Sequence, residues 1–351
     1  MMVRKIVGSL PFLVVFALFQ PLEGQDPQQY QWTLNRPDAQ GPVGLRGDRV
    51  LRDGEFQVDL KYFNQQMKGQ GFGTDSLTVN EVLTFFDASP SEMVAQGFEV
   101  NLLWGVTEHL TLTAAGTVAK KKMDHLAGLE GQSNVFLYYQ TASTGLEDVT
   151  VNALYNVYDR GSMKVHVNGG VSIPVGSIDT DDETPFSGTG SAILPYPQQL
   201  GSGTVDLIPG FTFNTQNEKA SLGLQGEAVI RLGENDRGWT LGDVYQGTMW
   251  GGYGISDWVS VSLGAQYSSW GNVEGFDEAV DPNETPAHNT LAQAGWRVDL
   301  PLGLNLLLPE GRFGGHRVGL EILVPLHQNL EGPQLMHNWT IVVGWQTSIG
   351  S

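Results

Sequence analysis

Residues 149–172 read VTVNALYNVYDRGSMKVHVNGGVS, and this stretch decides the fold. Apolar and polar side chains alternate through its first part, from Val149 to Val157, and again through its second part, from Val165 to Val171. A period of two residues is typical of a β-strand whose faces meet different surroundings. Between the two parts, residues 159–162 read Asp-Arg-Gly-Ser, which suits a tight turn. The stretch therefore predicts a β-hairpin.

The same alternation returns along the chain, and no stretch shows a convincing helical period. The alternating segments run for about 9–12 residues, which is long for a soluble protein and close to what a membrane-spanning strand needs. We count twelve segments, and ten or fourteen stay open because the connection near 300–315 is longer than a tight turn. The segments lie near 55–63, 95–104, 110–119, 147–157, 162–172, 203–213, 219–232, 241–255, 258–268, 290–300, 315–325 and 336–348.

The connections between these segments alternate in length. Short ones lie near 105–109, 159–162, 215–219 and 256–257, and long ones near 64–94, 120–146, 173–203 and 269–289. Outer-membrane barrels are built with short periplasmic turns and longer outward loops. An even strand count also places both ends of the chain on the periplasmic side. We therefore expect an all-β protein, a transmembrane antiparallel β-barrel.

Composition agrees with this fold class and excludes several functions. The 351 residues contain 19 Lys and Arg against 38 Asp and Glu, which gives a formal net charge of −19. A protein that neutralises phosphates needs a basic face, so we expect no nucleic-acid partner. The absence of cysteine excludes disulfides, thiolate catalysis and cysteine-ligated metal centres. A secreted, soluble β-sandwich is the alternative that composition leaves open.

Aromatic residues favour the barrel over the sandwich. In a sandwich they would lie in the core between two sheets. In a membrane barrel they prefer the interface between lipid tails and headgroups, so they form a band at matching strand ends. The aromatic residues beside the expected short turns or the C-terminal end are Trp104, Tyr155, Phe213, Tyr253, Trp258 and Trp345.

The first residues have the pattern of a secretory signal. Arg4 and Lys5 precede an apolar stretch, and Pro21 and Gly24 follow it. This stretch of about 14 residues is shorter than the roughly 20 that span a bilayer, which disfavours a membrane anchor. We expect a signal peptide over 1–24, secretion to the periplasm, and insertion into the outer membrane of a Gram-negative bacterium.

The segment before the first strand, residues 25–53, has two alternative locations. Arg36 and Asp38, followed by the turn-forming Gly41, indicate an ordered conformation. The segment either stays in the periplasm or folds into the lumen as a plug. The chain thus divides into a signal peptide, this periplasmic or luminal segment, and a barrel over 54–351.

Several short motifs resemble one family of bacterial outer-membrane proteins. The most specific is the proline-rich block LPYPQQLGSGT at 194–204, with IPVGSI at 173–178 before it and GHR at 315–317 after it. The family is that of the meta-pathway phenol-degradation outer-membrane proteins, which are also labelled transporters, and the resemblance spans roughly residues 32–348. It implies a barrel and a transport role, with organic or aromatic compounds as candidate solutes, and it identifies no substrate.

Polar side chains occupy one face of the strands, and this face should line the lumen. They either select solutes by size and charge or form a salt-bridged network that fills the barrel. We expect the arginines among them to pair with Glu227, Asp299 and Glu321 around an open lumen. The charged pore-lining candidates are Glu99, Lys164, His166, Asp206, Glu227, Arg231, Arg297, Asp299, Arg317 and Glu321.

No motif for catalysis or metal binding stands out. The acidic runs near 179–183 and 277–284 lack the spacing of an EF-hand and indicate solvated loop charge, with divalent cations as the alternative. The seven histidines show no zinc-binding spacing, and there is no nucleophile elbow or P-loop. We therefore expect neither a catalytic centre nor a cofactor.

These features favour a passive outer-membrane channel for small solutes. A structural or surface-binding barrel with a closed lumen is the alternative, and a membrane-embedded hydrolase is a third hypothesis. The expected partners are outer-membrane lipid, lipopolysaccharide and the barrel-assembly machinery, together with a small-molecule solute if the barrel is a channel.

Overall fold

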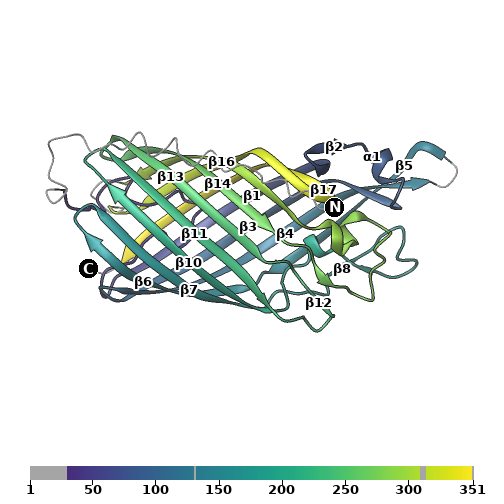
Figure 1. The fold of residues 1–351 in the computed structure, drawn as a ribbon, viewed down its shortest axis with the longest axis horizontal. Helices are drawn as coiled ribbons and strands as arrows, with labels where there is room; N and C mark the ends of the chain where they lie inside the picture. The colour runs from purple at the N-terminus through teal and green to yellow at the C-terminus, as the bar shows by residue number, and fades with distance from the viewer. Residues whose placement is uncertain (1–29, 130–131, 309–313, 350–351) are drawn as a thin grey trace, which may run out of the picture.

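The computed structural model describes residues 30–129, 132–308 and 314–349. These residues form one long antiparallel sheet that closes into a barrel (Figure 1), as the alternation predicted. The signal peptide expected over 1–24 lies outside the described residues. No helix in the described part is long and apolar enough to cross a membrane.

Eleven strands form the wall, each paired with the next along the chain, and the last pairs with the first to close the ring. Closure matters in lipid because each unpaired backbone N–H or C=O group costs several kcal/mol there. The wall strands are β1 (Phe56–Gly73), β3 (Ala88–Thr107), β4 (Leu110–Leu129), β6 (Val149–Arg160), β7 (Met163–Ile173), β10 (Val205–Gln216), β11 (Ala220–Leu232), β13 (Val244–Ser256), β14 (Val259–Trp270), β16 (Gly295–Leu307) and β17 (Arg317–Ile349).

The last wall strand, β17, turns back on itself. Residues 317–330 pair with β16 and residues 330–349 pair with β1, in both cases antiparallel. A hydrogen bond of 2.7 Å from Arg317 to Gln346 joins the two arms. Gly332 lies at the bend with a φ of 97°, a conformation that glycine adopts most readily. Counting both arms of β17, the ring has twelve antiparallel passes, so the expected number of strands is confirmed.

Successive side chains of the wall point in opposite directions, as the sequence predicted. On β3, Phe98 is 67% exposed and Trp104 is 49% exposed, whereas Glu99 and Asn101 are 8% and 2% exposed. Large apolar side chains occupy the outward row on the other wall strands too, where they meet lipid. The inward row is polar and is buried by what fills the lumen.

The first strands of the wall extend further than the alternation predicted. β1, β3 and β4 continue past their expected segments, and β4 pairs there with an additional strand, β5 (Gln132–Leu146). The stretches near 64–94 and 120–146, expected as long loops, are therefore largely strands, and that expectation was wrong. On this part of β4 the outward row changes to Lys120 and Lys122, because it meets water and no longer lipid.

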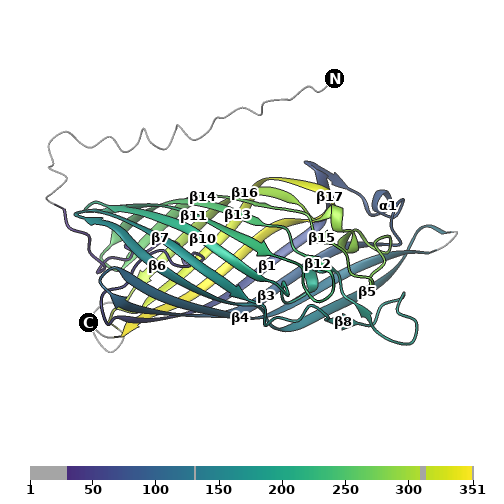
Figure 2. The ribbon, with the colours of Figure 1, turned by 60° about the horizontal axis from the view of Figure 1, so that its bottom comes forward.

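Short elements gather at the end of the barrel opposite the tight turns (Figure 2). Tyr196, Trp239 and Val273, from three different connections, form an apolar cluster that holds several of them together. The rings of Tyr196 and Trp239 pack edge to face, with centroids 5.1 Å apart. The short elements are β2 (Asp75–Leu77), α1 (Val79–Val82), β8 (Asp181–Asp182), β9 (Ala192–Ile193), η2 (Tyr196–Gln198), β12 (Trp239–Thr240), β15 (Glu274–Gly275), η3 (Pro286–His288) and η4 (Thr290–Ala292).

Candidate functional site

The lumen is filled towards one end and hollow towards the other. Near the tight turns, residues 36–52 lie inside the ring and form hydrogen bonds with inward-facing side chains of β1, β3, β7, β10, β11 and β17. We call residues 36–52 the luminal segment and the part of the lumen around them the filled half. The part of the lumen on the side of the short elements is the hollow half.

The luminal segment has no regular secondary structure, so its backbone groups need partners from the wall. Nζ of Lys61 donates to the carbonyl of Leu45 at 2.8 Å. Nδ2 of Asn214 donates to the carbonyl of Asp48 at 2.7 Å. The inward polar row of the filled half therefore satisfies the backbone of the segment.

An ion cluster around the buried carboxylate of Glu99 binds the luminal segment to β1 and β3. Nε of Arg46 donates to Glu99 at 3.0 Å, and Nζ of Lys61 lies 3.4 Å from the other oxygen of the same carboxylate. A buried carboxylate that has two cations beside it is compensated, whereas one that has lost a partner is strongly destabilising. Glu99 thus links the wall to the segment.

Arg317 is bound by neutral groups and not by a carboxylate. Its side chain is 3% exposed, and Nη2 donates to the carbonyl of Gly41 at 2.7 Å and to Asn305 at 2.6 Å. Glu321, its expected partner, instead accepts a hydrogen bond of 2.9 Å from the backbone N–H of Gly44. The expected pairing of Arg317 with Glu321 was therefore wrong. The lumen is not open at this point, and both side chains bind the backbone of the luminal segment that fills it.

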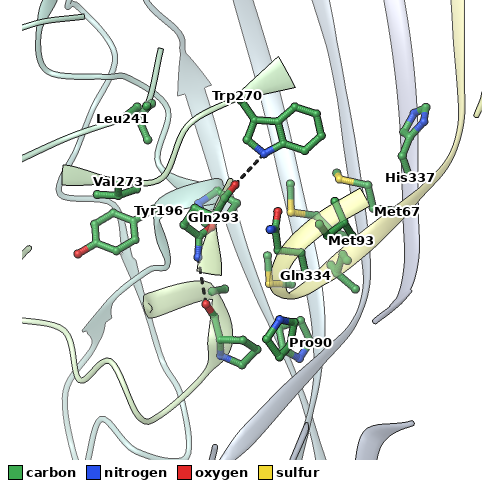
Figure 3. Close-up of a pocket in the computed structure, with 18 of the residues that line it drawn as sticks. Met67, Pro90, Met93, Tyr196, Leu241, Trp270, Val273, Gln293, Gln334 and His337 are labelled. Carbon is green, nitrogen blue, oxygen red and sulfur yellow. Dashed lines mark hydrogen bonds between the residues drawn. The ribbon is translucent and has the colours of Figure 1, made fainter. Parts of the chain in front are cut away.

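The hollow half contains a cavity of about 390 Å³ (Figure 3). Met67, Met93 and Met123 line it and pack against one another. Trp270 also lines it, and its Nε1 donates to the carbonyl of Gln293 at 2.7 Å, which orients the indole ring. A cavity of this size holds one small organic molecule, and methionine adapts well to irregular apolar ligands.

Two outer connections complete the lining of the cavity, and we call residues 194–200 and 283–293 the cap. The backbone N–H of Ala88, at the outer end of β3, donates to the carbonyl of Glu284 at 2.7 Å. The block 194–204, the most specific motif in the sequence, therefore contributes its first part to the roof of the cavity.

Three titratable groups of the cap have shifted pKa values, and burial raises that of Tyr196. Burial, followed by the neighbouring carboxylates of Asp281 and Asp87, raises the pKa of Glu284 to about 7. Burial lowers the pKa of His288 to about 4, so this ring is neutral at physiological pH. The cap therefore contains one carboxyl group that changes its charge near neutrality.

Several pore-lining candidates lie outside the cavity. Those that contact the luminal segment are Glu99, His166, Arg317 and Glu321. Nε2 of His166 lies 2.9 Å from the carbonyl of Gly47. Glu227 lines a smaller void of about 30 Å³ beside the segment. Lys164 lies at the tight-turn end, where it forms an ion pair of 2.8 Å with Asp159.

The remaining four candidates belong to the hollow half. Arg231 and Arg297 line the cavity, and each binds a fully buried carboxylate, Asp206 and Asp299 respectively. The expected pairing of Arg297 with Asp299 is confirmed, with a hydrogen bond of 2.7 Å. The pairing of Arg231 with Glu227 was wrong, because Asp206 lies directly opposite Arg231 in the register of β10 and β11.

The apolar lining of the cavity and one cation of the filled half were not predicted. Met67 and Met93 lie in stretches expected as loops, so nothing placed them on inward faces. Lys61 lies in the polar row of the first strand, and its alternation with Tyr62 was sufficient to identify it as luminal.

Within the described residues, no group of three or more His, Asp or Glu side chains could hold a metal ion.

A closed antiparallel barrel with an apolar outer surface and a polar lumen defines the class of bacterial outer-membrane β-barrels. The chain belongs to the family described as "Putative MetA-pathway of phenol degradation", whose model matches residues 95–299. The resemblance inferred from the short motifs is thereby confirmed. No curated protein matches the chain.

Solved structures of other outer-membrane proteins resemble this barrel. The COG4313 outer membrane channel from Pseudomonas putida F1 is 11% identical, with 87% of this chain and 99% of that chain covered and a TM-score of 0.57. The Ralstonia pickettii toluene transporter TbuX is 9% identical, with 93% and 100% covered and a TM-score of 0.42. The first similarity establishes a shared fold.

Proposed function

We propose that the protein is a passive outer-membrane channel for small, largely apolar solutes, aromatic compounds among them. The observation that carries this proposal is the cavity of about 390 Å³ inside the barrel, with Met67, Met93 and Trp270 in its lining. The fold shared with an outer membrane channel of Pseudomonas putida and the phenol-degradation label of the family support the same function.

A channel fits the cavity better than an enzyme does. Its lining within the described residues contains no serine, no threonine and no acidic residue, so a hydrolase would lack both an aliphatic hydroxyl nucleophile and a carboxylate there. A purely structural barrel with a closed lumen would have no need for a pocket of this size. The cavity therefore favours solute binding on the way through the barrel.

Passage beyond the cavity requires the luminal segment to move, because residues 36–52 occupy the filled half. Polar contacts hold much of the segment, such as that between Lys61 and the carbonyl of Leu45, and water can replace them during a displacement. No energy source is needed for such a movement. We therefore expect transport to depend on the freedom of the segment.

An engineered disulfide between the luminal segment and the wall tests this mechanism. The chain has no cysteine of its own, so no other disulfide can form. A Cβ on Gly252 of β13 would lie 3.1 Å from Cβ of Asp38, slightly below the roughly 3.5–4.5 Å of a disulfide. We expect the oxidised double variant Asp38→Cys/Gly252→Cys to take up labelled toluene or phenol into proteoliposomes about tenfold more slowly than its reduced form. Both single-cysteine variants serve as controls and should not respond to the oxidant.

Two outcomes would contradict the proposal. If oxidised and reduced forms transport equally fast, solutes do not pass through the filled half. If the wild-type protein carries none of the solutes faster than protein-free vesicles do, the structural alternative with a closed lumen replaces the channel.

A further inference from the structure

The charge of the cavity differs in sign from the charge of the chain. Its charged lining residues are Lys121, Arg231 and Arg297, and no residue of the lining within the described part is Asp or Glu. The whole chain, by contrast, has 38 acidic and 19 basic residues. A lining that presents cationic donors and no carboxylate to the cavity favours an anionic head group over a cationic one.

Each of these cations is held in place by a carboxylate that lies outside the cavity. Asp206 binds Arg231, Asp299 binds Arg297, and Glu147 lies 3.2 Å from Nζ of Lys121. Asp206 and Asp299 are fully buried in the wall. The carboxylates therefore fix the orientation of the cations and do not themselves meet a ligand in the cavity.

Donor groups of both arginines remain available. Arg297 uses Nε for its bond to Asp299, and its two terminal amino groups have no hydrogen-bond partner among the described residues. Arg231 donates to Asp206 through Nη1, and its Nη2 group has no hydrogen-bond partner among the described residues. A carboxylate satisfies the terminal amino groups of a guanidinium with good geometry.

Apolar surface lies directly beside these donors. The guanidinium carbon of Arg297 is 6.0 Å from the ring centre of Trp270, and Met67 and Met93 belong to the same lining. We propose that the cavity selects small apolar carboxylates, with the carboxylate bound at Arg297 and Arg231 and the apolar body against Trp270 and the methionines. This inference rests on the proposed channel function and names the substrate class for it.

A set of ligands with one ring and three head groups tests the selectivity. Benzoate, benzyl alcohol and benzylamine differ in charge and little in size, and their binding to the full-length protein in nanodiscs is measured by equilibrium dialysis at neutral pH. We expect benzoate to bind about tenfold more tightly than benzyl alcohol, and benzylamine to bind most weakly. Equal affinity for benzoate and benzyl alcohol, or tighter binding of benzylamine, would overturn the inference.

Substitution of one cation localises the effect. Arg297→Gln keeps polar hydrogens but removes the charge, so it should weaken benzoate binding about tenfold and change benzyl alcohol binding by less than about twofold. Lys164→Gln removes a cation at the tight-turn end and is the matched control, expected to change neither. Unchanged benzoate binding in Arg297→Gln overturns the inference. If that variant does not fold, Arg231→Gln replaces it and is judged by the same change in benzoate binding, together with the relative affinities of the wild-type protein for the three ligands.

Flux measurements separate this inference from the channel itself. Selective binding of benzoate without transport of any of the three ligands would support the inference and contradict the channel. Transport of benzyl alcohol without selective binding of benzoate would leave the channel in place and overturn the inference.

Discussion

The filled half and the hollow half of the lumen are enclosed by one wall, yet the side chains of that wall have different partners. In the filled half they bind a separate stretch of chain, as Lys61 binds the carbonyl of Leu45 and Arg317 that of Gly41. In the hollow half the cations bind carboxylates of the wall, as Arg297 does. The wall therefore satisfies its own charges around the cavity, but around the luminal segment it depends on the segment.

This difference teaches how to interpret an inward polar row. A polar row facing the lumen is compatible with water, with a ligand or with a piece of the protein's own backbone, since each supplies hydrogen-bond partners. Glu99 and Arg231 occupy equivalent inward positions, yet one binds the luminal segment and the other lines a cavity. Polarity alone does not reveal which half is hollow.

The largest expected effect is the loss of Arg317 from the filled half. Arg317→Met leaves the carbonyl of Gly41 and the amide oxygens of Asn305 and Gln346 without their donor. We expect a loss of roughly 3–5 kcal/mol in the free energy of unfolding, together with a rise in ion conductance as the segment loosens. Urea unfolding in lipid vesicles and planar-bilayer recordings measure the two effects.

The matched substitution in the hollow half is Met93→Leu. It conserves volume in an apolar lining, so it should change the free energy of unfolding by less than about 1.5 kcal/mol and leave conductance unchanged. If Arg317→Met and Met93→Leu lower the free energy of unfolding by similar amounts, the filled half does not depend on its contacts with the luminal segment more than the hollow half depends on its apolar lining.

The wall of the barrel could be predicted because lipid and lumen place opposite demands on successive residues. Residues 149–172 became the hairpin of β6 and β7, with bounds within about three residues of those expected. The prediction failed for the outer part of β4 and for β5, where water replaces lipid and Lys120 and Lys122 stand in the outward row. Alternation of hydrophobicity marks a strand only where its faces meet different solvents.

A smaller effect is expected from adding volume beside the luminal segment. A Cβ on Gly319 of β17 would lie 2.7 Å from Cβ of Val43, which is almost fully buried. Gly319→Leu therefore overpacks the filled half and should lower the free energy of unfolding by about 1–3 kcal/mol. Val43→Gly in the same chain should restore part of the loss, because it removes the side chain that collides.

Ala287→Leu is the corresponding change in the hollow half. Ala287 belongs to the lining of the cavity, so the larger side chain has room and should destabilise the protein less than Gly319→Leu does. It should also weaken ligand binding by reducing the volume of the cavity. A larger loss of stability in Ala287→Leu than in Gly319→Leu would contradict the description of the two halves, and unfolding in vesicles compares them directly.

Less of the site than of the wall could be predicted, because its contacts join distant parts of the chain. The choice of Asp206 over Glu227 as the partner of Arg231 depends on the register between two strands, which alternation does not specify. The contact of Lys121 with the carbonyl of Gln199 joins a strand to the cap across 78 positions. The location of residues 36–52 was left open for the same reason, since no local pattern distinguishes a plug from a periplasmic tail.

The smallest expected effect concerns the cap over the hollow half and is a dependence on pH. The folded pKa of Glu284, raised to about 7 by burial and by Asp281 and Asp87, exceeds the roughly 4.3 of a free glutamate. The contribution of Glu284 to the stability of the cap is therefore fully present below about pH 4, and it is lost as the pH rises through about 7, when the buried carboxyl group ionises. The ring of Tyr139 stays neutral across this range. His288 acts in the opposite sense below about pH 6.5, because burial lowers its pKa to about 4 and its ring gains a proton there only when the cap opens.

Hydrogen exchange measures this local opening. The N–H of Ala88 donates to the carbonyl of Glu284, so its protection, after correction for the intrinsic rate, should fall between about pH 6.5 and pH 8, where only Glu284 changes its charge. Glu284→Gln cannot ionise and should keep the protection constant, while backbone groups in the filled half, such as the N–H of Gly44, should show no such change in either protein. A fall in protection that persists in Glu284→Gln would assign the dependence to another group. Equal changes at Ala88 and Gly44 would mean that the whole barrel responds and that the cap opens no more independently than the filled half.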